Sequence, residues 1–95
     1  MIDRHITFNV HADQTEAFEQ FFVDRYGPTM AKAPGFVRVE LLRELDGPTR
    51  YQMVLRWEDV DSAAGWRTSE VHQALQPELN ALFSDNEIQG YAVIA

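Results

Sequence analysis

Three side chains in this sequence have the chemistry of a small catalytic site: Asn9, Trp66 and His72. An imidazole titrates near neutral pH and can remove a proton from a substrate, so His72 is a candidate general base. The amide of Asn9 can polarise a substrate oxygen, and the indole of Trp66 offers an apolar wall and an N–H donor. Such a set suits the direct reaction of a substrate carbanion with oxygen in a dry pocket, which requires no metal and no cofactor.

The same residues also have purely structural interpretations. His72 can be a partly exposed helix residue, and Trp66 can pack a helix against a sheet. Because an amide on a buried strand must be hydrogen-bonded, Asn9 can equally serve a neighbouring backbone group. His5 and His11 are expected at a strand edge or on the surface. Two classes of function therefore stay open: an enzyme, and a binding or interaction module without catalysis.

The elements that must position Trp66 and His72 are predicted from the stretch that precedes them. A strand with one apolar face is indicated by the alternation of Tyr51, Met53, Leu55 and Trp57 with polar residues. Asp59 or Asp61 then caps a helix that carries Trp66 about two turns in. Ser69, followed by Glu70, is predicted to cap a second helical segment, which carries His72 in its first turn.

The rest of the chain follows the same logic. Alternation of Ile6, Phe8 and Val10 with polar residues predicts a first strand. A helix capped by Asp13 or Thr15 is predicted to follow, and its apolar stripe consists of Phe18, Phe21, Phe22 and Tyr26. Gly27-Pro28 is expected to kink or end that helix, and Pro77 to kink the last one. Strands are predicted for Phe36–Leu45 and Ile88–Ile94. The order β-α-β-β-α-β predicts one ferredoxin-like α+β domain over residues 1–95, an antiparallel sheet with two helices on one face.

Pairing in the hairpin between the second and third strands can be predicted from chemistry. Placing Leu41 opposite Leu55 makes one face almost wholly apolar, with Val39 opposite Trp57 and Leu45 opposite Tyr51. The same register sets Glu40 opposite Arg56, Arg38 opposite Glu58, and Leu42 opposite Val54, with Asp46–Arg50 as the loop.

Composition excludes several partners. The formal charge is −7 and the pI is about 4.7, and the 8 basic residues are scattered, which argues against nucleic acid and anionic membranes. The sequence has no cysteine, so neither a disulfide framework nor a thiolate metal site is expected. Charges interrupt Ile2–Val10, which is too short for a membrane span or a signal sequence. A cytoplasmic location is the expectation.

One face of the predicted sheet has no helix to cover it. Leu42 and Val54 lie on that face, together with one side of the first strand, and an exposed apolar patch commonly marks an interface. A second copy of the same sheet is the simplest cover. The sequence therefore predicts a homodimer.

Several short motifs carry a family resemblance. The run P-G-F at Pro34–Phe36, the run L-L-R at Leu41–Arg43, and the residues Tyr51, Trp57, Trp66 and Ser69 resemble the antibiotic-biosynthesis-monooxygenase family of the dimeric α/β-barrel superfamily. The run Tyr26–Phe36 also resembles the ethyl tert-butyl ether degradation (EthD-like) branch, with Tyr26 in place of the usual histidine before Gly-Pro.

The resemblance implies a function and an orientation. It implies cofactor-independent oxygenation of a small hydrophobic aromatic metabolite such as a quinol or anthrone. It also implies that Asn9, Thr7 and His5 point beneath the helices, into a cavity whose further substrate-binding residues are Tyr26, Tyr51, Met53 and Leu55. Asn9 and Trp66 are also similar to residues of haem-degrading relatives. The haem-ligand position, however, is occupied here by Leu75 or Gln76, neither of which is an ordinary axial ligand, so haem degradation is not expected.

Overall fold

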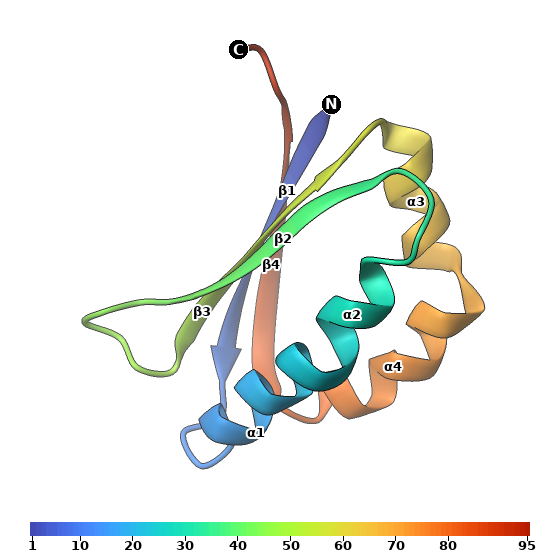
Figure 1. Ribbon diagram of the computed structural model, residues 1–95. Helices are drawn as coiled ribbons and strands as arrows, with labels where there is room; N and C mark the ends of the chain where they lie inside the picture. Colours follow the sequence, from blue (N-terminus) through green and yellow to red (C-terminus); the bar gives the residue numbers. More distant parts are fainter.

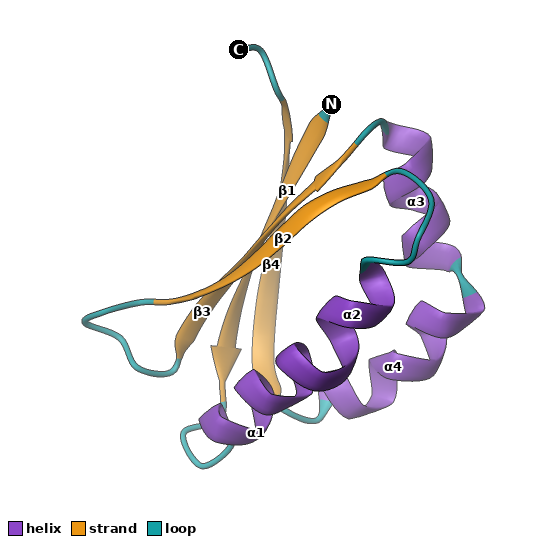
Figure 2. Cartoon of the chain, viewed as in Figure 1, coloured by secondary structure: helices purple, strands orange, loops and turns teal.

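The computed structural model shows a four-stranded antiparallel sheet with all helices on one face (Figures 1 and 2). The strands are β1 (Ile2–Val10), β2 (Phe36–Arg43), β3 (Arg50–Trp57) and β4 (Phe83–Ala92), in the spatial order β2-β3-β1-β4. This order, with β1 and β3 in the centre, is that of the ferredoxin-like fold, so the predicted fold class is confirmed. The last strand begins five residues before the predicted Ile88.

The first helical segment does not end at Gly27-Pro28. It consists of α1 (Thr15–Phe21), a π-helical turn η1 (Phe22–Tyr26) and α2 (Gly27–Met30). In the π turn the backbone N–H of Gly27 bonds to the carbonyl of Phe22, five residues back. The change of hydrogen-bond pattern falls immediately before Pro28, which has no N–H to donate. Gln14 stands at the start of α1 with no side-chain cap, so the predicted cap at Asp13 or Thr15 is wrong.

The second helical segment follows the prediction closely. It consists of α3 (Val60–Thr68) and α4 (Glu70–Asn80), with Pro77 inside α4. Asp59 accepts a hydrogen bond from the backbone N–H of Ser62 at 2.7 Å. Ser69 accepts one from the backbone N–H of His72 at 3.2 Å. The break at Ser69, where α3 ends and α4 begins, therefore sets the direction in which the side chain of His72 points.

The predicted register of the β2–β3 hairpin is wrong by two residues. Leu41 lies opposite Met53, not Leu55, and the pairing shifts between Phe36 and Arg38. Because the shift is even, each side chain stays on its predicted face. The predicted ion pairs of Arg56 with Glu40 and of Arg38 with Glu58 do not form. Arg56 instead hydrogen-bonds at 2.6 Å to Asp3, the residue opposite it on the neighbouring strand β1.

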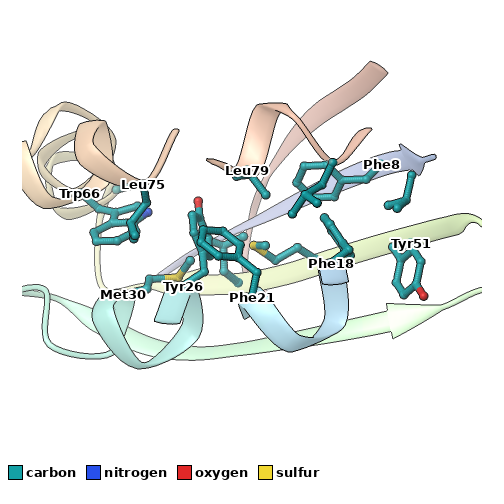
Figure 3. Packing of buried hydrophobic residues seen from close by; sticks show 14 of the residues in the cluster. Phe8, Phe18, Phe21, Tyr26, Met30, Tyr51, Trp66, Leu75 and Leu79 are labelled. Carbon is teal, nitrogen blue, oxygen red and sulfur yellow. The ribbon is translucent and has the colours of Figure 1, made fainter. Parts of the chain in front are cut away.

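The core lies between the sheet and the helices and is rich in aromatic rings (Figure 3). Phe8 and Trp57 are fully buried in it, and the ring of Phe18 packs against Tyr51 at 5.0 Å between centroids. Leu42 and Val54 lie on the opposite, open face of the sheet, as expected, although most of their neighbours there are polar. None of the helices is long and apolar enough to cross a membrane.

Candidate functional site

A cavity of about 310 Å³ lies between the sheet and the helical layer, at the end of the core where α3 meets α4. Its floor comes from β1, β3 and β4, and its roof from η1, α3 and α4. A volume of this size lies at the lower end of the range for small-molecule sites. The lining is mostly apolar, with a few polar side chains, and consists of Arg4, Ile6, Phe8, Tyr26, Leu55, Trp57, Ala63, Trp66, Arg67, His72, Gln73, Gln76, Leu79, Asn80, Phe83, Asn86 and Ile88.

Tyr26, the last residue of the π turn, is buried and lines this cavity. Its ring meets Trp66 at 5.9 Å and His72 at 6.1 Å between centroids, nearly edge-on in both cases. Burial raises the pKa of Tyr26 to about 12, although the indole N–H of Trp66 and the charge of Arg4 both oppose this rise. The hydroxyl therefore keeps its proton at neutral pH and can donate it in a hydrogen bond to a substrate oxygen.

His72 is held in one tautomer by its neighbours. Its Nδ1 lies 2.9 Å from the backbone carbonyl of Arg67, which can only accept, so Nδ1 carries the proton. Nε2 is then the basic nitrogen, and it accepts from the side-chain amide of Gln76 at 2.7 Å. Burial lowers the pKa of His72. The bond to the Arg67 carbonyl opposes this effect, while the charges of Arg4 and Arg67 lower the pKa further. His72 is thus neutral at pH 7, with a lone pair on Nε2.

Arg4 is a charged residue on the apolar face of β1. It lies between Ile2 and Ile6, opposite Leu55, and is partly buried. Burial lowers its pKa, and the neighbouring charge of Arg67 lowers it further, whereas Tyr26 has the opposite effect. No carboxylate lines the cavity. The charged side chains of its lining are therefore the two arginines, Arg4 and Arg67.

Four of the eight predicted site residues line this cavity: Tyr26, Leu55, Trp66 and His72. Tyr51 and Met53 are buried in the core but do not line it. Figure 3 shows Tyr51 at the end of the cluster remote from Trp66. Its hydroxyl hydrogen-bonds to Glu19 on α1.

The expected orientation of Asn9 and Thr7 is wrong. Thr7 pairs with Gln52, and Asn9 with Arg50, on the open face of the sheet. The amide of Asn9 donates to Asp85 on β4. His5 lies on the same face, where its ring meets Tyr91 at 4.6 Å. The alternation of β1 explains this result, because burying Ile6, Phe8 and Val10 against the helices sends the intervening residues to the opposite side.

Sequence reasoning missed the positive side chains of the cavity, Arg4 and Arg67. A signal was present for Arg4, because a charge interrupts the apolar series Ile2, Ile6, Phe8 at a position that must face the helices. Arg67 had no such signal, since an exposed arginine in the last turn of a helix is ordinary. Gln76, named in the sequence analysis only because it occupies the haem-ligand position of relatives, hydrogen-bonds to His72. No three His, Cys, Asp or Glu side chains come together, so no metal centre can be assigned.

The structure is that of a ferredoxin-like protein with a small, mostly apolar cavity between its sheet and its helices. Residues 1–78 match the model of the antibiotic biosynthesis monooxygenase family, and the chain belongs to this family. The first of the two resemblances seen in the sequence is thereby confirmed. No curated protein matches the chain in sequence.

Solved structures agree with this assignment. The chain is similar to SnoaB, a cofactor-independent oxygenase from Streptomyces nogalater, with 28% identity and a TM-score of 0.90 over 99% of this chain and 93% of SnoaB. A Nitrosomonas europaea protein assigned to the antibiotic biosynthesis monooxygenases superposes with a TM-score of 0.88 at 19% identity, with both chains fully covered. A conserved Methanosarcina mazei protein superposes with a TM-score of 0.84 at 21% identity, over 95% of this chain and 89% of that one. The last two likenesses concern the fold alone.

Proposed function

We propose that this protein is a cofactor-independent monooxygenase that oxidises a small aromatic substrate of the anthrone or quinol type in the cavity beneath α3 and α4. The observation that carries the proposal is that His72, with its basic Nε2, and Tyr26, with its protonated hydroxyl, line the same cavity, their rings 6.1 Å apart between centroids. A base and an oxyanion donor in one apolar site are the groups that carbanion chemistry needs. Membership of the family and the similarity to SnoaB support the same reaction class.

The first step on an anthrone would be removal of a proton from its methylene carbon by Nε2 of His72. The amide of Gln76 occupies that lone pair in the structure, so its side chain must turn away when substrate enters. The electron pair left behind spreads to the substrate carbonyl oxygen. Tyr26 can donate a hydrogen bond to that oxygen, which is stronger in a site of low polarity than in water.

The second step would be the reaction of the carbanion with oxygen. A C–O bond forms between the substrate carbon and O₂, which gives a peroxide. The O–O bond then breaks as the second methylene proton leaves, so that a carbonyl remains on the carbon and the other oxygen atom departs as water. The substrate supplies all four electrons, and no external reductant is needed. The apolar walls, among them Phe8 and Leu55, keep bulk water away from the carbanion.

We further propose a homodimer formed through the open face of the sheet. Leu42 is 48% exposed on this face, and no helix packs over it. The face also carries the ion pair of Arg56 with Asp3, which can contribute polar contacts to an interface. Sedimentation equilibrium tests the proposal, and a monomer at micromolar concentration would contradict it.

Two tyrosines provide a matched test of the oxygenase. Each is buried and each loses only its hydroxyl on change to phenylalanine, but Tyr26 lines the cavity and Tyr51 does not. In oxygen-uptake assays with an anthrone, Tyr26→Phe should lower kcat by roughly 10²-fold or more, as removal of one oxyanion donor does. Tyr51→Phe should leave kcat unchanged. Equal rates in both variants, or no uptake by a wild-type protein that binds the anthrone, would favour a binding module without catalysis.

A further inference from the structure

The arginines of this acidic protein fall into two groups. The 8 basic side chains are Lys32 and seven arginines. Five of these arginines lie within 4.0 Å of a carboxylate, namely Arg25, Arg38, Arg43, Arg50 and Arg56. The two that have no such partner, Arg4 and Arg67, both line the same cavity. Lys32 also has no carboxylate within that distance but does not line this cavity, so among the arginines it is only the two at the cavity that are left without an internal counterion.

The two charges act on one another. Arg67 lowers the pKa of Arg4, and both lower the pKa of His72, so all three side chains share one electrostatic environment. For the partly buried Arg4, burial and a second positive charge in the same cavity lining are both unfavourable, and a bound anion would offset both. The developing oxyanion of the proposed reaction exists only transiently and already has Tyr26 as a donor. A permanent anion on the ligand would stabilise the pair throughout binding.

The strand opposite Arg4 leaves space for such an anion. Arg4 pairs across the sheet with Gly90 of β4, and a methyl group built on Gly90 would meet no atom within 4 Å. The nearby part of β4 contributes Ile88 and Asn86 to the lining, so this side of the cavity has an apolar surface and an amide but no acid. The guanidinium of Arg4 is therefore not covered by the neighbouring strand.

We propose that the cavity selects aromatic substrates that carry a carboxylate, with the carboxylate bound by Arg4 and Arg67 and the ring held against Trp66 and Leu55. This inference rests on the proposed function, in that it names the class of substrate for that site. A planar guanidinium matches a carboxylate with two parallel hydrogen bonds, which fixes the orientation of a ligand as well as its affinity. The carboxylate would hold the ring in one position relative to Nε2 of His72.

Calorimetric titration with two probes tests the proposal without relying on turnover. The probes are 1-naphthol and 1-hydroxy-2-naphthoate, which differ by one carboxylate. The wild-type protein should bind the naphthoate about tenfold more tightly or better, as expected for a charge-assisted pair. Arg4→Gln should abolish this preference while binding naphthol as before. Arg38→Gln, which changes an arginine on the open face, should retain it. Equal affinities in the wild type, or an unchanged preference in Arg4→Gln, would overturn the proposal.

A second variant covers the case in which Arg4→Gln does not fold. Gly90→Glu introduces a carboxylate beside Arg4, in space that the structure leaves open. It should compete with the naphthoate and lower its affinity about tenfold, with little effect on naphthol, and retention of the full preference would contradict the inference.

The outcomes also separate this inference from the proposed function. Turnover of a neutral anthrone without any carboxylate preference would refute only the inference. Selective naphthoate binding, with no oxygen uptake on any anthrone, would refute only the oxygenase.

Discussion

Replacing His72 by asparagine separates its chemistry from its place in the structure. The side-chain amide of asparagine can still donate to the Arg67 carbonyl, as Nδ1 does at 2.9 Å, but it has no basic nitrogen. If His72 removes the substrate proton, kcat should fall by about 10² to 10⁴, the usual contribution of a positioned base. At about 1.36 kcal/mol per tenfold change, this corresponds to roughly 2.7 to 5.5 kcal/mol of transition-state stabilisation.

The same prediction fixes the direction in which kcat/KM should change with pH. His72 has a lowered pKa, chiefly because it is buried, so its neutral form persists below the ordinary value of about 6.5. Wild-type kcat/KM should therefore be level through pH 7 and fall only as the pH drops below about 6.5. In His72→Asn that acid limb should disappear, and only the reduced rate should remain.

The assay is oxygen uptake on an anthrone between pH 5 and 9, with circular dichroism to confirm folding at each pH. His11→Asn is the matched control, because His11 is exposed at the end of β1 and outside the cavity. A wild-type inflection at or above 6.5 would refute the assigned environment of His72. A variant His72→Asn with near wild-type rates would remove the residue from the mechanism.

Two further predictions concern stability. Gly35→Ala should destabilise the fold by about 1 to 3 kcal/mol, because Gly35 has φ of 80° and a Cβ there would lie 2.1 Å from Oγ of Ser62. Gly65→Ala lies in open space on α3 and should instead stabilise the fold by roughly 0.5 to 1 kcal/mol. Chemical denaturation measures both, and equal effects would contradict the backbone argument. Wild-type stability should also decline as the pH falls from about 6.5 towards the lowered pKa of His72, because protonating His72 costs more in the folded than in the unfolded state. Above pH 6.5 the imidazole of His72 is neutral in both states, so stability should not change there through this group. Denaturation of His72→Asn should show no decline in that window, and an identical decline would assign it to other groups.

The parts of the fold that sequence predicted well depend on neighbouring residues. Asp59 and Ser69 cap their helices through bonds to residues three positions along, and such contacts can be read from the local sequence. The hairpin register failed because it depends on a third strand. Arg56 binds Asp3, which lies 53 residues away, and no pattern within the hairpin reveals that partner.

The site was predicted in part for a similar reason. His72 and Trp66 reach the cavity because two adjacent capped helices direct them there. Asn9 was assigned to the cavity through a family resemblance, against the alternation of its own strand, and the alternation decided its position. The apolar series on β1 had placed Arg4 on the inner face by the same rule. A charge at an inward position was thus a better guide to this site than a polar residue at an outward one.

Arg4 connects the two chemical properties of the cavity. Its charge helps to lower the pKa of His72, which keeps the base unprotonated, and the same charge opposes the rise in the pKa of Tyr26. Both effects arise because no carboxylate in the cavity neutralises Arg4. An internal acid would stabilise the free protein but would raise the pKa of His72 and occupy the guanidinium that a substrate needs. Leaving Arg4 unpaired therefore costs stability in the empty cavity and makes both the base and the anion site available to a ligand.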